Sequence, residues 1–303
     1  MIFQDMKAQA FGKWILAGEH TVIRGGPALV FPVYAKSLEL TYTASEQAAT
    51  CDFYGETGNE FKLLFWGVMQ KGFELANQPG VELKGKFEFQ SSVPVGAGLG
   101  ASATLCVTIS KWFLAQNIIQ EAEVYEFARQ LENLFHGESS GVDIAVALSG
   151  KGLHFERNGK CYDFESAWQP CWYISHSGKH GITSECVKKV KLLQEKNPNL
   201  ALEIDRDMRL ATERAERALR VKLENSMSEL KSAIDLAESC FQKWGLAGGE
   251  VSKHMSDLKA AGALAAKPTG SGDGGYILSL WSGPPILTNC EIKDLELVPL
   301  FKH

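Results

Sequence analysis

The sequence feature that most constrains this chain is a glycine-rich segment, Pro94-Val-Gly-Ala-Gly-Leu-Gly-Ala-Ser-Ala103, between an expected strand and an expected helix. Its three glycines let the backbone adopt positive φ and approach a ligand without a Cβ clash. The N–H groups of such a loop point inward and the helix N-terminus adds partial positive charge, so phosphate is the natural ligand. The segment lacks the Gly-Lys-Ser/Thr of a Walker A loop, and its spacing is not that of a dinucleotide fingerprint. A turn whose glycines only permit tight helix packing is the alternative.

A second segment, Phe11–Pro27, gathers polar side chains at the two ends of a short apolar strand. Lys13 precedes this strand, and Glu19 and His20 follow it. The arrangement indicates a site, although a solvated lysine and a structural histidine would give the same pattern.

A third segment runs from Glu132 to Asp143. Glu132 lies at the end of an expected helix, and Asp143 follows a Ser-Ser-Gly turn in the first turn of the next helix. The helix dipole favours an ionised carboxylate at that position. The alternative is an aspartate that only stabilises the helix start. A fourth segment, Lys267–Tyr276, is another glycine-rich turn that leads into a strand.

The remaining sequence predicts a mixture of strands and helices by its hydrophobic periodicity. Strands are expected at 15–16, 28–33, 38–43, 81–90, 172–175 and 275–281, with a hairpin of 153–155 and 161–164 around Asn158–Gly159. Helices are expected at 61–76, 102–116, 119–135, 184–195, 202–224, 227–244 and 249–261. A shift in composition near 167–170 predicts a domain boundary close to residue 170.

Composition excludes several classes of function. A net charge of −5 argues against a nucleic-acid surface, which needs a basic face. The seven cysteines are scattered and include no Cys-x-x-Cys pair, so we expect free thiols in a reducing cytosol rather than disulfides or a zinc site. No apolar run approaches the roughly 18 residues of a membrane span, and the N-terminus has no signal-peptide core. We therefore expect a cytoplasmic protein with no membrane or nucleic-acid partner.

Taken together and in this order, the four segments resemble the GHMP kinase superfamily, which includes galactokinase, homoserine kinase, mevalonate kinase and phosphomevalonate kinase. The Gly-Lys…Gly-Glu-His opening, the Gly-Ala-Gly-Leu-Gly loop and His136-Gly-x-x-Ser-Gly-Val-Asp143 are most similar to the mevalonate kinases. The resemblance implies an α+β fold of two domains. Residues 1–170 would form an ATP-binding domain like ribosomal protein S5 domain 2, and residues 171–303 a ferredoxin-like domain, with ATP and the acceptor meeting between them.

The resemblance also implies roles for individual residues. The ATP phosphates would be wrapped by Gly96, Ala97, Gly98, Leu99, Gly100, Ala101 and Ser102. Ser102 and Glu132 would hold Mg²⁺, for which oxygen ligands are suited. Asp143 would accept the proton of the substrate hydroxyl, and Lys13 would stabilise charge at the reacting oxygens. Glu19, His20 and Thr269 would shape the substrate pocket.

Two residues depart from the family pattern. Ala101 replaces the first serine of a Ser-Ser pair, which removes only a secondary hydrogen bond because Ser102 is kept. Asp273 stands in a run that is usually glycine or alanine. Its carboxylate either points at the nucleotide, where it would repel the phosphates, or hydrogen-bonds N–H groups of its own turn, and we favour the turn.

The function implied by the resemblance is phosphoryl transfer from ATP to a small carboxylate-bearing alcohol, most closely mevalonate to 5-phosphomevalonate. Phosphomevalonate kinase, or another small-molecule kinase of the superfamily, is the nearest alternative, and a non-catalytic ligand sensor is a third. A phosphorylated acceptor would require additional Lys or Arg in the pocket. Related kinases are often dimers, so a homodimer is expected.

Overall fold

The computed structural model describes residues 3–55, 58–157, 160–286 and 295–301. Its contacts divide the chain into two compact units. The first unit comprises residues 1–13, 32–95 and 100–150, and the second comprises 14–31, 96–99 and 151–303. The chain passes between these units several times before residue 151. The division into domains at residues 1–170 and 171–303 stays a prediction.

The sheet of the first unit uses the two longest strands of the chain, β1 (Met6–Ala17) and β2 (Pro27–Ala48), each of which continues into the second unit. In the first unit β4 (Lys84–Ser91) lies between β2 and β3 (Thr50–Gly55), antiparallel to β2 and parallel to β3. Alternate residues of β2 and β4 are buried, with Leu40 opposite Phe89 in the register. This period of two places one face of the sheet against a hydrophobic core.

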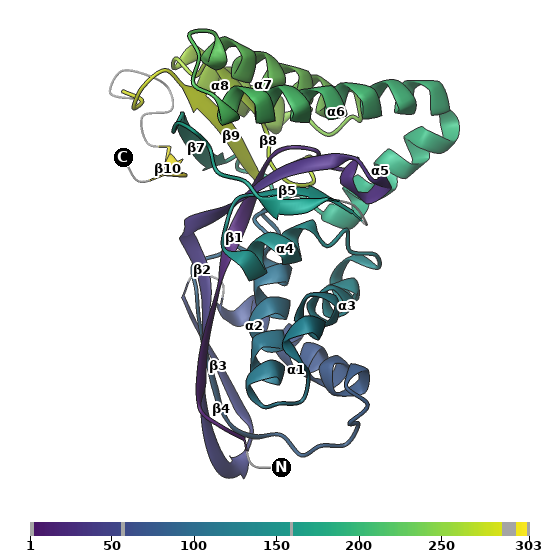
Figure 1. The fold of residues 1–303 in the computed structure, drawn as a ribbon, viewed down its shortest axis with the longest axis vertical. Helices are drawn as coiled ribbons and strands as arrows, with labels where there is room; N and C mark the ends of the chain where they lie inside the picture. The colour runs from purple at the N-terminus through teal and green to yellow at the C-terminus, as the bar shows by residue number, and fades with distance from the viewer. Residues whose placement is uncertain (1–2, 56–57, 158–159, 287–294, 302–303) are drawn as a thin grey trace. The chain divides into compact units, whose positions relative to one another are not determined.

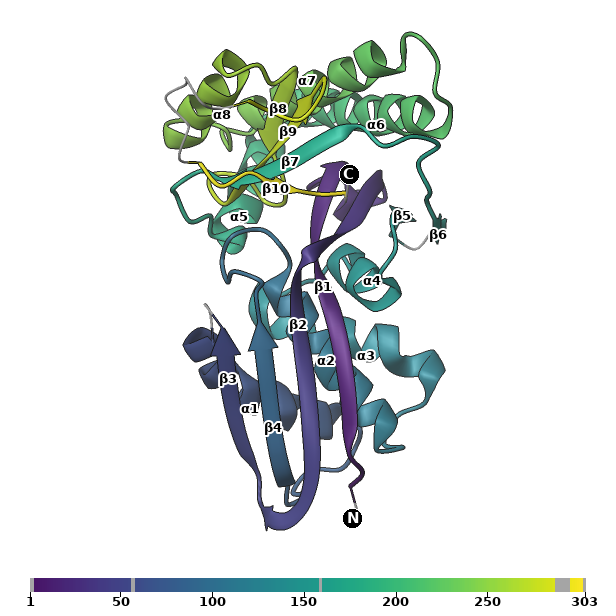
Figure 2. The same ribbon diagram turned by 90° about the vertical axis from the view of Figure 1, so that its left-hand side faces the viewer.

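The helices of the first unit are α1 (Gly58–Leu75), α2 (Ala101–Ala115), α3 (Val124–His136) and α4 (Val142–Ser149), with a 3-10 turn at Glu121–Glu123. In Figures 1 and 2, α1, α2 and α3 lie on one face of the β2–β4–β3 sheet. Helix α2 is buried on nearly every side, and Trp112 packs against Phe87 with ring centroids 5.4 Å apart. A helix that is apolar all round is a core element. Its N-terminus, which carries Ser102, is therefore fixed in position.

The second unit contains an antiparallel sheet in the order β10-β7-β9-β8. Its strands are β7 (Cys171–His176), β8 (Ala265–Pro268), β9 (Tyr276–Trp281) and β10 (Val298–Pro299). The expected hairpin strands are also present, as β5 (Leu153–Glu156) and β6 (Cys161–Asp163), and β5 pairs with residues 27–30 of β2. The Asn158–Gly159 turn itself lies outside the described residues.

Four helices complete the second unit, α5 (Thr183–Lys196), α6 (Pro198–Arg220), α7 (Ser226–Lys243) and α8 (Glu250–Ala260), together with the 3-10 turn η1 (Val22–Arg24). Figure 1 shows α6, α7 and α8 stacked beside β8 and β9. Ile204, Met208, Phe241 and Ile277 are fully buried in the shared core. Asn197 caps α6 by accepting a hydrogen bond from the Leu200 N–H, and a proline occupies the first turn.

The expected mixture of helices and sheets is confirmed, and all seven expected helices are present. Strand β2 was expected as two short strands. Its residues 27–33 are buried on both faces and Tyr34 and Ala35 are both exposed, so the alternation of buried and exposed side chains is interrupted there. Strands β3, β8 and β10 were missed. Within the described part of the chain, no helix is both long and apolar enough to cross a membrane.

Candidate active site

Lys13 and Asp143 form an ion pair in the first unit, with Lys13 Nζ 3.3 Å from Asp143 Oδ2. Lys13 comes from β1 and its side chain is 4% exposed, whereas Asp143 lies in the first turn of α4 and is 24% exposed. Gly100, the N-cap of α2, adopts a positive φ of 73° beside this pair. A Cβ there would lie 3.0 Å from Lys13 Cγ and 3.5 Å from Asp143 Oδ2. Glycine is therefore needed for the loop backbone to reach the ion pair.

Glu132 is buried at the end of α3 between two serine hydroxyls. Ser102 Oγ lies 3.5 Å from Glu132 Oε1, and Ser139 Oγ donates a short hydrogen bond to Glu132 Oε2. Burial, followed by the charge of Asp143, raises the pKa of Glu132 to about 7, although Ser139, Lys13 and Ser102 act in the opposite direction. A carboxylate that is costly to ionise in isolation is stabilised by a bound cation.

The chemistry of this group fits Mg²⁺. A serine hydroxyl and a carboxylate are hard oxygen donors, and Mg²⁺ usually takes one or two protein ligands while keeping water and substrate phosphates as the others. Consistent with so sparse a set, the described residues contain no cluster of three or more His, Cys, Asp or Glu arranged to hold a metal. The structure thus places the Ser102 hydroxyl next to the Glu132 carboxylate.

In the second unit, the residues Gly96–Leu99 pack against the turn that follows β8. A Cβ on Gly98 would lie 3.0 Å from the Thr269 carbonyl oxygen, and one on Gly275 would lie 2.4 Å from the Ala97 carbonyl oxygen. The Tyr276 N–H also donates to Ala97 O at 3.2 Å. The two glycine-rich segments predicted from the sequence therefore contact each other directly, backbone against backbone.

Thr269 and Glu19 are both buried in the second unit, where each has a protein partner. Thr269 Oγ1 accepts a hydrogen bond from the Ile15 N–H at 2.8 Å. Glu19 forms an ion pair with Lys267, whose Nζ lies 2.5 Å from Glu19 Oε1 and 3.3 Å from the Ile15 carbonyl oxygen. Lys267 is fully buried. The sequence analysis assigned no role to this lysine. A lysine at the end of the apolar run Ala265–Lys267 could have indicated that a buried carboxylate pairs with it.

His20 follows Glu19 with a positive φ of 59°, which is uncommon for a residue other than glycine. Its Nε2 lies 2.9 Å from the Ser271 carbonyl oxygen, and its ring packs edge-on against Trp244. The side chain is only partly buried. Of the three residues predicted to shape the substrate pocket, His20 is the most accessible.

The favoured account of Asp273, a carboxylate that hydrogen-bonds its own turn, is wrong. Its carboxylate pairs with two lysines of the second unit, Lys179 at 2.6 Å and Lys189 at 2.5 Å, rather than with N–H groups of its own turn. Burial raises the pKa of Asp273, but the hydrogen bonds from the two lysines outweigh it and hold the pKa below its ordinary value. The residue has a positive φ of 56°, and its N–H donates to the Leu246 carbonyl at 2.7 Å.

The segment that contains the candidate site is similar to a known protein family. Residues 64–151, which include α2, Ser102, Glu132 and Asp143, match the GHMP kinases N terminal domain. The mevalonate kinase of Archaeoglobus fulgidus is 28% identical over 92% of this chain and 93% of its own length. This chain is therefore similar to the GHMP kinases over residues 64–151 and to a mevalonate kinase over most of its length.

Solved structures share the fold of this chain. The Leishmania major mevalonate kinase in complex with R-mevalonate superposes with a TM-score of 0.72 and 21% identity, covering 93% of this chain and 89% of that one. The Methanococcus jannaschii mevalonate kinase gives a TM-score of 0.74 at 18% identity, covering 98% of both chains.

Proposed function

We propose that this chain is a kinase of the GHMP superfamily that transfers the γ-phosphoryl group of ATP to the hydroxyl of mevalonate, giving 5-phosphomevalonate and ADP. The observation that carries the proposal is the Lys13–Asp143 pair, held against Gly100 of the glycine-rich loop. The identity of the acceptor is inferred from the curated relatives, which are named mevalonate kinase.

In this proposal Asp143 accepts the proton of the acceptor hydroxyl. It is the more exposed member of its ion pair, so a hydroxyl can reach its carboxylate. General-base assistance of this kind typically contributes about 10²–10⁴ in rate. Lys13 is nearly inaccessible to water, and a fixed positive charge in a dry environment stabilises developing negative charge more strongly than one in water. Lys13 would thus stabilise the oxygens between which the phosphoryl group moves.

Ser102 and Glu132 would hold Mg²⁺. The ion, when bound, offsets the negative charge of the ATP phosphates. The hydrogen bond from Ser139 orients the Glu132 carboxylate for this task. The backbone N–H groups from Gly96 to Ser102, with the N-terminus of α2, would bind the phosphates themselves.

His20 would bind the acceptor carboxylate. Its partly buried ring is held in a defined orientation by Ser271 and Trp244. Glu19 and Thr269 would shape the same pocket. Thr269 accepts a hydrogen bond from the Ile15 N–H, and Glu19 pairs with Lys267, which donates to the Ile15 carbonyl. The homodimer and the cytoplasmic location stay predictions.

The test is a measurement of ADP release with Mg²⁺-ATP and a panel of acceptors, namely R-mevalonate, phosphomevalonate, galactose and homoserine. We expect kcat/KM for R-mevalonate to exceed that for each of the others by about 100-fold or more, because buried polar groups discriminate strongly between acceptors. A higher kcat/KM for phosphomevalonate would reassign the substrate. Absence of turnover with every acceptor, in a protein that binds ATP, would favour the sensor alternative.

A further inference from the structure

The turn that follows β8, residues 269–275, carries a charged side chain that the proposed mechanism does not use. Asp273 has a positive φ of 56°, which aspartate adopts more readily than most residues. Two lysines of the second unit converge on its carboxylate. Lys179 Nζ lies 2.6 Å from Oδ1 and Lys189 Nζ lies 2.5 Å from Oδ2. Each oxygen of the carboxylate therefore has an ammonium partner.

The two lysines come from different elements. Lys179 lies in the segment between β7 and α5, and Lys189 lies on α5. The Gly275 N–H also donates to the Lys179 carbonyl at 2.7 Å. Gly274 and Gly275 lack a Cβ, so the backbone at the end of the turn has much conformational freedom to restrain. The Asp273 carboxylate and this backbone hydrogen bond together fix the end of the turn.

The end of the turn lies directly against the glycine-rich loop in the second unit. The Tyr276 N–H donates to the Ala97 carbonyl at 3.2 Å, and a Cβ on Gly275 would lie 2.4 Å from the same oxygen. Peptide units are planar and none of the described ones is cis, so the Gly98 N–H points opposite to the Ala97 C=O. Holding that carbonyl therefore also orients the Gly98 N–H, one of the groups proposed to bind the ATP phosphates.

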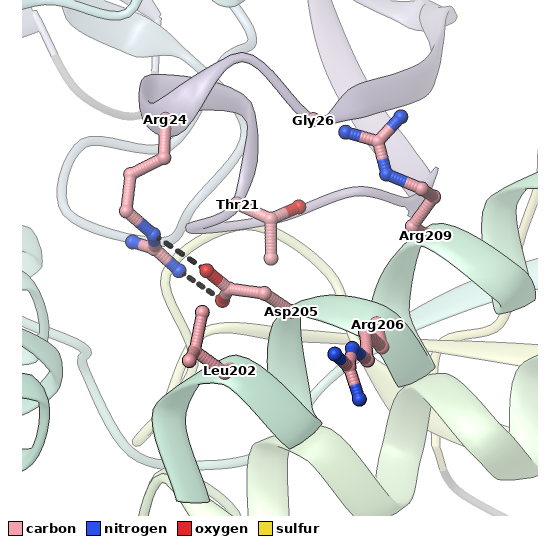
Figure 3. Close-up of a pocket in the computed structure, with 7 residues that line it drawn as sticks. All are labelled: Thr21, Arg24, Gly26, Leu202, Asp205, Arg206 and Arg209. Atoms are coloured by element: carbon pink, nitrogen blue, oxygen red, sulfur yellow. Dashed lines mark hydrogen bonds and ion pairs between the residues drawn. The ribbon is translucent and has the colours of Figure 1, made fainter. Parts of the chain in front are cut away.

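The middle of the turn is anchored separately. His20 Nε2 lies 2.9 Å from the Ser271 carbonyl oxygen, and the His20 carbonyl accepts a hydrogen bond from Arg24 Nη1 at 3.0 Å. Figure 3 shows Arg24 held in turn by Asp205 of α6, to which it donates two hydrogen bonds. Loss of the charged contacts at the end of the turn should therefore leave Ser271 and His20 in place.

We propose that Asp273 is a positioning residue for ATP, which holds the end of the turn through Lys179 and Lys189 and so orients the Gly98 N–H. The inference rests on the proposed function, in which N–H groups of the glycine-rich loop bind the ATP phosphates. The two lysines act through Asp273, not by contact with the nucleotide. Removal of the negative charge should consequently weaken ATP binding. Direct contact between the lysines and the phosphates would give the opposite sign, because removal of Asp273 would release their charge.

The test is isothermal titration calorimetry of the wild type and Asp273→Asn with the Mg²⁺ complex of a non-hydrolysable ATP analogue. Asparagine keeps the shape of the side chain and tolerates the positive φ, so the charge alone is lost. We expect the Kd to rise about 3- to 10-fold, a modest change because the two lysines are 41% and 46% exposed. The KM for ATP should rise by a similar factor, whereas kcat and the KM for the acceptor should stay within about twofold of the wild type.

Glu216→Gln is the matched control. Glu216 is 16% exposed, against 21% for Asp273, and it also has two basic partners. These are Arg220 on α6 at 2.6 Å and His154 on β5 at 3.0 Å. The control should bind the analogue like the wild type. Lys189→Met completes a double-mutant cycle, since it should weaken binding in the wild type but have little further effect in Asp273→Asn.

The inference is overturned if Asp273→Asn binds the analogue as well as Glu216→Gln does, or more tightly than the wild type. It is also overturned if the acceptor KM rises as much as the KM for ATP, or if the effects of Asp273→Asn and Lys189→Met are additive. A wild type that does not bind the analogue would overturn the proposed function as well, so the two failures are distinguishable.

Discussion

The buried ion pair between Lys267 and Glu19 yields the sharpest prediction about stability. The two side chains are 0% and 1% exposed, and they join strand β8, which contains Lys267, to the segment that follows β1. Replacing Lys267 with methionine keeps most of the side-chain volume but removes the cation beside the Glu19 carboxylate. Breaking a buried pair from one side typically costs about 3–5 kcal/mol, because a charge stays behind in a medium that solvates it poorly.

The assay is urea unfolding at pH 7 of the wild type, Lys267→Met and the double variant Glu19→Leu/Lys267→Met. The double variant removes both charges, and replacement of a buried pair by apolar side chains is often neutral, so it should recover most of the loss. Lys243→Met is the control. Lys243 also contacts two carboxylates, Glu203 at 2.8 Å and Asp207 at 2.7 Å, but it is 31% exposed, and such pairs contribute about 0–1 kcal/mol.

The reasoning is refuted if Lys267→Met loses no more free energy of unfolding than Lys243→Met. It is also refuted if the double variant is as unstable as Lys267→Met, because the cost would then come from packing rather than from an uncompensated charge. Phe241 lies 5.2 Å from Lys267 Nζ and would be the affected packing partner.

Three further predictions concern single carboxylates. Asp143→Asn should lower kcat by about 10²–10⁴ while ATP binding and the unfolding midpoint stay unchanged, and turnover within a few-fold of the wild type would remove Asp143 from the mechanism. Glu132→Gln should raise the Mg²⁺ concentration needed for half-maximal activity, whereas an unaltered Mg²⁺ titration would make Glu132 a structural residue only. Asp273→Asn should destabilise the protein at pH 7. Because the native pKa of Asp273 is lowered, the carboxylate stabilises the protein above its ordinary pKa of 3.8, and this stabilisation disappears as the pH falls through the native pKa. An Asp273→Asn variant that is destabilised equally at pH 7 and well below pH 3 would contradict the ion-pair explanation.

The helices could be predicted from the sequence because their apolar residues recur with a regular period. Helix α2 was expected at 102–116 and is observed at Ala101–Ala115. Helix α6 was expected to begin at residue 202 but begins at Pro198, because Asn197 and Pro198 form a start signal that precedes the first periodic residue. The expected helix over 119–135 is a 3-10 turn followed by α3, since Gln120 and Glu123 form a capping box before the α-helix.

Within the candidate site, the sequence could suggest the residues that we propose to carry chemistry, but it could not suggest their supporting partners. Ser102, Glu132, Lys13 and Asp143 lie in short segments with recognisable spacing. The partner of Glu19 is 248 residues away, and the partners of Asp273 are 84 and 94 residues away. Only the packing of β8 and the turn after it brings these charges together, and no local pattern encodes such a contact.

The most direct test of the proposed function follows the phosphorus atom itself. R-mevalonate and Mg²⁺-ATP are incubated with the enzyme and with Asp143→Asn, and the reaction is monitored by ³¹P nuclear magnetic resonance. The proposal predicts a new phosphate monoester signal that grows in equal amount with ADP, and that is nearly absent with Asp143→Asn over the same time. Release of ADP with inorganic phosphate and no monoester, or an equal monoester signal from both proteins, would contradict it.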